Sequence, residues 1–217
     1  MPIVIKDYIK GFCKEYNFVN LNGKQLENVK TEVDNKVYEL LVNRLLVSVE
    51  IERQIKNNIL EIGTGICTYL KSNNPYKDEV EFDKFHKKYC DLWCGGYKDV
   101  DNDKILSFSV AQMVVNMYFK YLYCWAIENG KKRYFVFCHA SIDTYILNRV
   151  VKDKLYLEEE VMKNKGITRY IYWFHLDYEM YIRIQELFRS EEYLGRLYKG
   201  FSPLKIEFVL QGLRNNY

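Results

Sequence analysis

Four polar residues lie at helical spacing inside a long apolar stretch, Leu106–Ile127 (LSFSVAQMVVNMYFKYLYCWAI). The stretch has no Gly or Pro, so it predicts a buried helix of about six turns. Buried amides need hydrogen-bond partners, so these polar residues predict that one face of the helix lines a substrate-binding cleft. The alternative is that this face is a narrow stripe exposed to solvent. The four polar residues are separated by three, four and four positions and share one stripe of the helix: Ser109, Gln112, Asn116 and Lys120.

A second candidate group is a histidine followed by two cysteines, His86, Cys90 and Cys94, at intervals of four. One helical face would present all three, and these residue types bind zinc. A zinc site needs a fourth ligand, and pairs of cysteines in zinc sites are more often separated by two residues. Buried cysteines are also ordinary core residues. We therefore predict neither a metal nor a cofactor.

The segment Ile59–Ile66, ILEIGTGI, is similar to the glycine-rich first loop of the adenosylmethionine-dependent methyltransferases. In that fold a strand ends at the acidic residue, and the glycines let the backbone approach the cofactor. The resemblance implies alternating strands and helices after the loop. The chain instead continues with helical patterns, so a methyltransferase is the third of three functional hypotheses.

The most informative segment is Ser141–Val150, SIDTYILNRV, which follows the long apolar stretch. It resembles the VDTHxxRV-type segment of the helix-hairpin-helix DNA glycosylases, the family of endonuclease III and the 8-oxoguanine glycosylases. The stretches YIRIQELF (181–188) and SPLKIEFVLQGL (202–213) resemble the closing helices of the oxoguanine branch. The resemblance implies a two-lobed helical fold and a catalytic aspartate, here Asp143, facing the base-excision pocket from a helix start.

The chain departs from that family in its hairpin. The family has an LPGVGxK-like turn whose glycines let backbone amides reach a DNA phosphate. At the matching place this chain has no glycine, and Gln112 or Met113 stands where bifunctional members have their nucleophilic lysine. Lys120 lies about two turns further along the same stripe. Because the nucleophilic lysine is missing from the turn, the resemblance implies a monofunctional enzyme at most. The iron–sulfur cysteines of endonuclease III are also absent.

Asp143 has a physical interpretation that does not depend on the family. An aspartate at a helix start caps the helix and is stabilised as an anion there. In a cleft, the same carboxylate stabilises an oxocarbenium-like sugar or activates a water. Capping alone is the structural alternative. Nearby aromatic residues, Tyr145 and Trp173 among them, predict stacking on a base, with core packing as their alternative.

Composition limits the class of protein. The chain has 217 residues, 48% hydrophobic and 16% aromatic, which is enough for a sizeable core in one large or two small domains. A formal net charge of +3 permits nucleic-acid binding without requiring it. No signal peptide is apparent, and the charge and amides inside Leu106–Ile127 argue against a membrane span. We expect a cytoplasmic protein with reduced cysteines and no membrane partner, of unknown oligomeric state.

Helical periodicity predicts a mostly α fold with minor β structure. Expected helices cover 37–58, 79–93, 106–127, 142–151 and 170–188, with a helix and loop within 152–168 and a last helix capped by Ser202 with Pro203 first. Residues 1–36 are expected to form an irregular arm or hairpin around Asn22-Gly23, and 59–70 is ambiguous. The predicted division is an N-terminal lobe, 1–104, and a glycosylase-like lobe, 105–217.

Two functional hypotheses rank above the methyltransferase. The first is an N-glycosidic hydrolase for a base in DNA or a nucleotide, with Asp143 as the catalytic carboxylate. The substrate-binding residues would be Ser109, Gln112, Asn116, Lys120, Tyr145 and Trp173. The second is a module of the same fold that binds a nucleotide, nucleic acid or protein without turnover.

Overall fold

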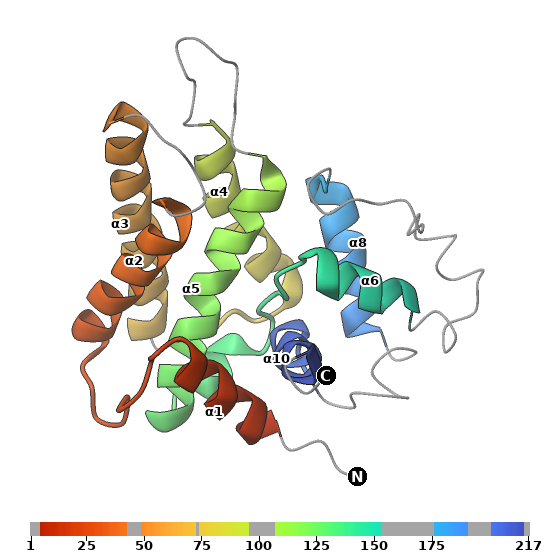
Figure 1. Ribbon diagram of the computed structural model, residues 1–217, viewed down its shortest axis with the longest axis horizontal. Helices are drawn as coiled ribbons and strands as arrows, with labels where there is room; N and C mark the ends of the chain where they lie inside the picture. The colour runs from red at the N-terminus through yellow and green to blue at the C-terminus, as the bar shows by residue number, and fades with distance from the viewer. Residues whose placement is uncertain are drawn as a thin grey trace. The chain divides into compact units, whose positions relative to one another are not determined.

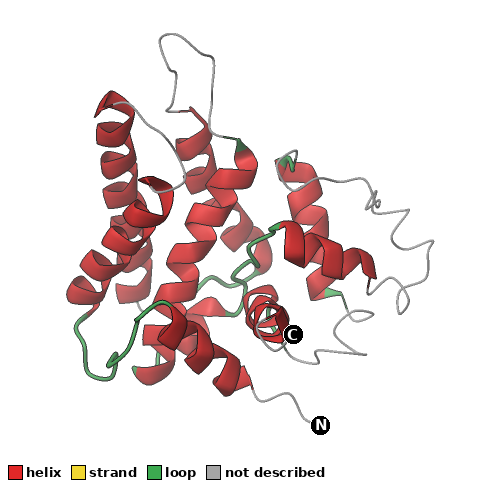
Figure 2. Ribbon diagram, in the orientation of Figure 1, coloured by secondary structure: helices red, strands yellow, loops and turns green. Residues whose placement is uncertain are grey.

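The computed structural model describes residues 5–42, 49–72, 74–95, 107–152, 176–190 and 201–214. Every regular element within these ranges is a helix, so the mostly α prediction is confirmed, and no strand occurs there to provide the minor β structure (Figure 1, Figure 2). The chain divides into two compact units, one of Met1–Asn17 and Cys138–Tyr217, and one of Phe18–Phe137. This division differs from the predicted segments 1–104 and 105–217.

The unit of Phe18–Phe137 is a helical bundle around α5 (Phe108–Glu128). Helix α5 packs against α2 (Leu26–Val42) and α4 (Glu79–Gly95), and α2 packs against α3 (Val49–Lys71). A short 3-10 helix, η1 (Lys132–Phe135), follows α5. The predicted helices at 79–93 and 106–127 are confirmed, and nearly all of α5 is buried, as its apolar composition requires. The predicted helix at 37–58 spans the end of α2, the start of α3 and residues outside the described ranges.

The glycine-rich segment Ile59–Ile66 lies inside α3, so the interpretation as a strand followed by a cofactor loop is wrong. The two glycines lie at close helix contacts instead. A Cβ atom on Gly63 would lie 2.5 Å from Asp34 Oδ1 of α2, and one on Gly65 would overlap the hydroxyl of Tyr89 of α4. Packing against neighbouring helices thus explains glycine at both positions without any cofactor.

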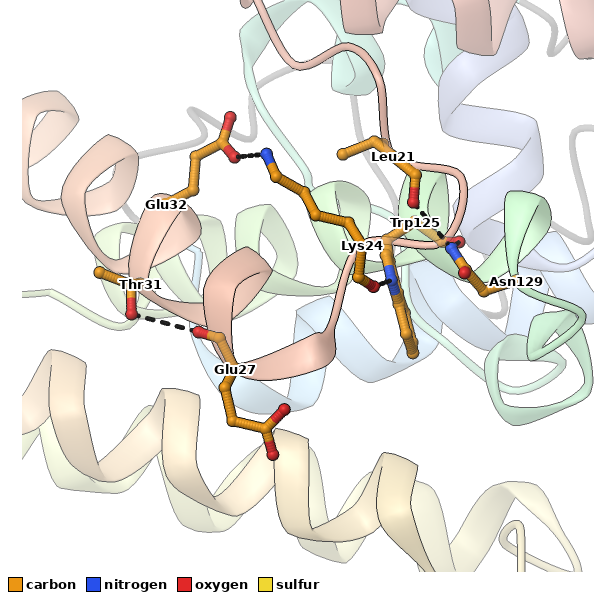
Figure 3. A network of polar contacts seen from close by, with 7 residues as sticks. All are labelled: Leu21, Lys24, Glu27, Thr31, Glu32, Trp125 and Asn129. Carbon is orange, nitrogen blue, oxygen red and sulfur yellow. Dashed lines mark hydrogen bonds and ion pairs between the residues drawn. The ribbon is translucent and has the colours of Figure 1, made fainter.

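The end of α5 anchors the turn that precedes α2 (Figure 3). The indole N–H of Trp125 donates to the backbone oxygen of Lys24 at 2.8 Å, and Asn129 Nδ2 donates to that of Leu21 at 3.0 Å. Asn129 Oδ1 accepts from the backbone N–H of Gly23 at 3.2 Å. Gly23 has φ of +70°, a conformation that glycine adopts without strain, so the predicted Asn22-Gly23 turn is confirmed.

The other unit contains α1 (Ile5–Glu15), α6 (Thr144–Lys152), α8 (Tyr178–Arg189) and α10 (Pro203–Arg214). Helix α10 packs against each of the other three. The irregular arm predicted for residues 1–36 is wrong for 5–15, where Ile5, Ile9 and Phe12 give one apolar face to a helix, and for 26–36, which lie in α2. None of the helices that the structure describes is long and apolar enough to cross a membrane.

Three predicted helix boundaries in this unit can be compared with the structure. Helix α6 matches the prediction for 142–151. Helix α8 begins at Tyr178, because Asp177 caps it by accepting from the backbone N–H of Met180 at 2.8 Å, and the predicted helix was wrong to include residues 176 and 177. Pro203 begins α10 as predicted, but the buried hydroxyl of Ser202 makes no hydrogen bond within the described ranges, so it provides no side-chain cap. The helix and loop predicted within 152–168 lie largely outside the described residues.

Candidate functional site

The polar stripe of α5 forms a chain of hydrogen bonds inside the unit of Phe18–Phe137. Gln112 Nε2 donates to the backbone oxygen of Ser109 at 2.9 Å, and Asn116 Nδ2 donates to Gln112 Oε1 at 3.1 Å. Asn116 Oδ1 lies 3.0 Å from Nε2 of His86 on α4. Ser109, Gln112 and Asn116 have no exposed surface and Lys120 is 1% exposed. The solvent-facing alternative is therefore wrong, and the amides are satisfied by neighbouring protein groups.

The stripe extends to a cysteine through His86. Cys90 Sγ lies 3.6 Å from His86 Nδ1, and both residues have no exposed surface. Burial raises the pKa of the Cys90 thiol well above its usual range, which keeps it protonated. Among the residues that the structure describes, no three His, Cys, Asp or Glu side chains are grouped to hold a metal ion.

A second buried polar contact joins α5 to α2 and α3. The Tyr118 hydroxyl lies 2.8 Å from Asp34 Oδ1 and 3.0 Å from the backbone oxygen of Ile59. Burial, followed by the neighbouring Asp34 carboxylate, raises the pKa of Tyr118 above its usual range. Lys30 forms an ion pair of 2.5 Å with the other oxygen of Asp34. This contact fixes three helices relative to one another within the bundle.

Asp143 lies at the start of α6 and caps it. Its Oδ1 accepts from the backbone N–H of Ile146 at 2.7 Å, and its backbone oxygen accepts from Leu147 at 2.9 Å. The side chain is half-buried. The helix N-terminus stabilises a carboxylate there. The structural alternative, capping, is thus present, and the residue as a whole is partly exposed.

The segment before Asp143, Cys138–Ile142, is held by buried side chains of α8 and α10. Gln185 bonds both backbone groups of Ala140: its Oε1 accepts from the N–H, and its Nε2 donates to the oxygen, both at 2.9 Å. Glu207 Oε2 accepts from the backbone N–H of Ser141 at 2.8 Å. Neither Gln185 nor Glu207 has any exposed surface.

Two further contacts complete this anchor. His139 Nδ1 lies 3.1 Å from the hydroxyl of Tyr181 on α8, and both side chains are fully buried. The backbone N–H of Leu204 donates to the backbone oxygen of Cys138 at 3.1 Å, which joins the segment to α10. In this short non-helical segment, buried side chains therefore bond the N–H and oxygen of Ala140 and the N–H of Ser141, and the backbone of α10 bonds the oxygen of Cys138.

The predicted site residues are divided between the two units. Ser109, Gln112, Asn116 and Lys120 belong to the unit of Phe18–Phe137, whereas Asp143 and the half-buried Tyr145 belong to the other. Trp173 lies outside the described residues. Sequence reasoning missed Gln185 and Glu207, although each occupies a position on an apolar helical stripe, which was the signal that could have found them.

Comparison with known proteins adds no relative. Neither a family model, nor a curated protein, nor a solved structure matches this chain. The resemblance of residues 141–150 to the DNA glycosylases therefore depends on those residues alone, and a role for Asp143 must be argued from the geometry around it.

Proposed function

We propose that this chain is a monofunctional N-glycosidic hydrolase that acts on a base in DNA or in a nucleotide, with Asp143 as the catalytic carboxylate. One observation supports the proposal most: a half-buried aspartate at a helix start follows a segment anchored by Gln185 and Glu207. A catalytic carboxylate must be held in place before the substrate arrives, and buried hydrogen bonds to its backbone support provide this.

The proposed reaction breaks the C–N bond between the sugar and the base, and the bonding electrons leave with the base. Positive charge develops on the sugar, and the Asp143 carboxylate stabilises it. Water then adds its oxygen to the anomeric carbon and loses one proton to the carboxylate or to solvent. The departing base takes up one proton from solvent, so the products are the free base and the sugar with a hydroxyl group. The reaction needs no redox partner.

A second candidate is a module that binds without turnover. The observation that favours it is the sequence at 108–113, FSVAQM, which has no glycine where the glycosylases have their hairpin turn. The burial of Gln112 and Asn116 among neighbouring protein groups supports neither candidate over the other. A binding module does not depend on the charge of Asp143. The two candidates are therefore separated by a substitution that removes only this charge.

Single-turnover release of free base from oligonucleotides and nucleotides, measured for the wild type, Asp143→Asn and Asp143→Ala, tests the proposal. Asn retains the capping ability, so Asp143→Asn should melt like the wild type and release base about 10²–10⁴ times more slowly. Asp143→Ala should in addition lose about 1 kcal/mol of stability. Undiminished base release by Asp143→Asn removes this residue from the mechanism. Binding without base release by the wild type favours the second candidate.

A further inference from the structure

Three consecutive cations, Lys131, Lys132 and Arg133, lie on the turn and the 3-10 helix that follow α5, and we call them the basic turn. Lys132 and Arg133 are exposed, and Lys131 is half-buried. Within the part of the chain that the structure describes, none of the three forms an ion pair. The basic turn belongs to the unit of Phe18–Phe137 and follows the end of α5 that is opposite to residues 108–113.

A buried aromatic ring fixes two of these cations. Lys131 Nζ lies 5.3 Å and Arg133 Cζ lies 5.2 Å from the centroid of the Tyr134 ring, and Arg133 Nη2 donates to the Tyr134 hydroxyl at 3.4 Å. Tyr134 is itself 1% exposed, and its hydroxyl donates to the backbone oxygen of Ser72, just after α3. The two positive charges are therefore held in place before a partner binds, which lowers the entropic cost of binding.

Two glycine turns beside the basic turn leave room for a partner. Gly130 directly precedes the basic turn, and the backbone N–H of Gly23 donates to Asn129 Oδ1 at 3.2 Å. Both glycines are exposed, with φ of +71° at Gly130 and +70° at Gly23. A Cβ atom on either would meet no atom within 4 Å, so the space above both turns is open. A large polymer can therefore approach the cations without meeting a side chain at these two positions.

Neighbouring lysines are already neutralised by acids of the same unit. Lys24 forms an ion pair of 2.6 Å with Glu32, and Lys71 forms one of 2.5 Å with Glu27. The basic turn has no such acid among the described residues, so its positive charge is available to a partner. Glu128 is the acid nearest to it in sequence, and in the described ranges this exposed residue forms no ion pair either.

The chemistry of the basic turn fits a phosphate backbone. The Arg133 guanidinium has a planar fork of N–H donors that matches two oxygens of one phosphate, and the two lysines add point charges beside it. Each strand of a nucleic acid presents a phosphate about every 3.4 Å along its axis, so adjacent cations can each meet one. Contacts of this kind hold the backbone without reading the sequence of bases.

We propose that the basic turn binds the phosphate backbone of a nucleic acid, with Lys131, Lys132 and Arg133 as the phosphate contacts. This surface does not rest on base release at Asp143, which belongs to the other unit. It stands if Asp143 proves to be only a helix cap, and it can fail while base release is observed.

The test is the binding of a short fluorescent DNA duplex of mixed sequence to the full chain, followed by anisotropy at several salt concentrations. The wild type should bind at low salt, with each phosphate contact adding about 0.9 to the slope of log binding constant against log salt. Lys132→Gln should therefore lower this slope by about 0.9, and replacing Lys131, Lys132 and Arg133 by Gln together should lower it by about 2.7. Lys132 has no polar or ring contact among the described residues, so Lys132→Gln should melt like the wild type.

Two control variants separate this surface from net charge alone. Lys56→Gln removes the same charge from an exposed position of α3 about 22 Å along the helix from Lys71, and it should leave the slope unchanged. Glu128→Gln removes the acid nearest in sequence to the basic turn and should tighten binding at low salt.

Three results would overturn the proposal. The first is the absence of duplex binding by the wild type at low salt. The second is an equal loss of slope in Lys56→Gln and Lys132→Gln, because net charge alone would then explain the binding. The third is tighter binding to phosphatidylserine vesicles than to the duplex at equal phosphate concentration, which would assign the basic turn to a membrane surface.

Discussion

The side chain of Gln185 bonds the backbone of one residue, Ala140, in the way that a neighbouring β-strand would. Its side-chain amide bonds both the N–H and the oxygen of Ala140, as a paired β-strand would, although the surrounding described elements are helices. Burying an amide and a carboxylate is costly unless their hydrogen bonds are made. Gln185 and Glu207 make them to one segment, which holds the backbone before Asp143 in one conformation.

The α5 chain of hydrogen bonds has a direction. Gln112 donates its amide N–H to the backbone oxygen of Ser109, which orients the amide oxygen of Gln112 toward Asn116. Asn116 donates to that oxygen and presents its own amide oxygen to His86. His86 Nε2 must therefore carry the proton in this contact, and Nδ1 can accept from the thiol of Cys90. Each donor in the chain has an acceptor, so the buried network is a structural element of the bundle.

Replacing Asn116 breaks this chain in the middle. Asn116→Leu removes the hydrogen bonds of Asn116 with His86 and with Gln112, each worth about 0.5–1.5 kcal/mol, so we expect a loss of about 1–3 kcal/mol in unfolding free energy. The exposed Asn57→Leu on α3 is the control and should change stability by less than about 0.5 kcal/mol. Urea unfolding gives both values, and equal midpoints for the two variants would mean that the network contributes nothing.

At the scale of the elements, the helices with continuous apolar periodicity were predictable. Helices α4, α5 and α6 have few residues that break a helix in their interiors, and their predicted limits lie within a few residues of those observed. Helix α3 was not predicted through Gly63 and Gly65, because local propensity disfavours glycine there. Glycine is required there by the close approach of Asp34 to Gly63 and of Tyr89 to Gly65, and both neighbours are distant in sequence. No local pattern contains that information.

Two glycines in helix interiors should respond oppositely to alanine. Gly65→Ala places a Cβ atom onto the buried Tyr89 side chain, and overpacking of this kind should cost about 1–3 kcal/mol, beyond the helix propensity gained. Gly11→Ala meets open space and should stabilise the protein by up to about 1 kcal/mol. Thermal melts of both variants measure this, and a higher melting temperature for Gly65→Ala would contradict the packing role of that glycine.

The candidate site was predictable only in part. Asp143 was recognisable because an aspartate before an apolar helical pattern is a capping signal, and the structure has that cap. The residues that anchor its segment come from about 45 and 66 positions further along, as the hydrogen bonds of Gln185 and Glu207 record. Which backbone group a buried polar residue bonds depends on the tertiary arrangement. The sequence could show only that Gln185 and Glu207 were unusual on apolar stripes.

Across the whole molecule, the six cysteines are free, and four of them are buried: Cys67, Cys90, Cys124 and Cys138. Burial raises the pKa values of Cys90 and Cys138 well above the usual range. At pH 8 a thiol reagent should therefore modify only the partly exposed Cys13 and Cys94 in the native protein, and all six after unfolding. Absorbance during reaction with a disulfide reagent counts the thiols, and rapid native modification of more than two would contradict this burial.

The pH dependence of stability follows from Cys67, whose pKa burial raises from 9.0 to about 11. Below pH 9 the thiol is protonated in both states and its contribution is fully present, whereas above pH 9 the unfolded state loses the proton first. Unfolding free energy should therefore fall between pH 9 and 11, by at most about 2 kcal/mol from this residue. Urea unfolding of wild type and Cys67→Ala tests it, and identical pH profiles would contradict it.

Amide hydrogen exchange at Ala140 tests most directly whether Gln185 of α8 fixes the segment before Asp143. In the wild type this N–H donates to Gln185 Oε1 inside the protein and should exchange slowly. Gln185→Met keeps the side-chain length but removes the acceptor, so exchange at Ala140 should accelerate by about tenfold or more beyond any change in global stability. The exposed Glu186→Met on the same helix should leave it unchanged. An Ala140 amide that exchanges equally slowly in Gln185→Met and in the wild type would contradict the anchoring of Asp143 by buried side chains.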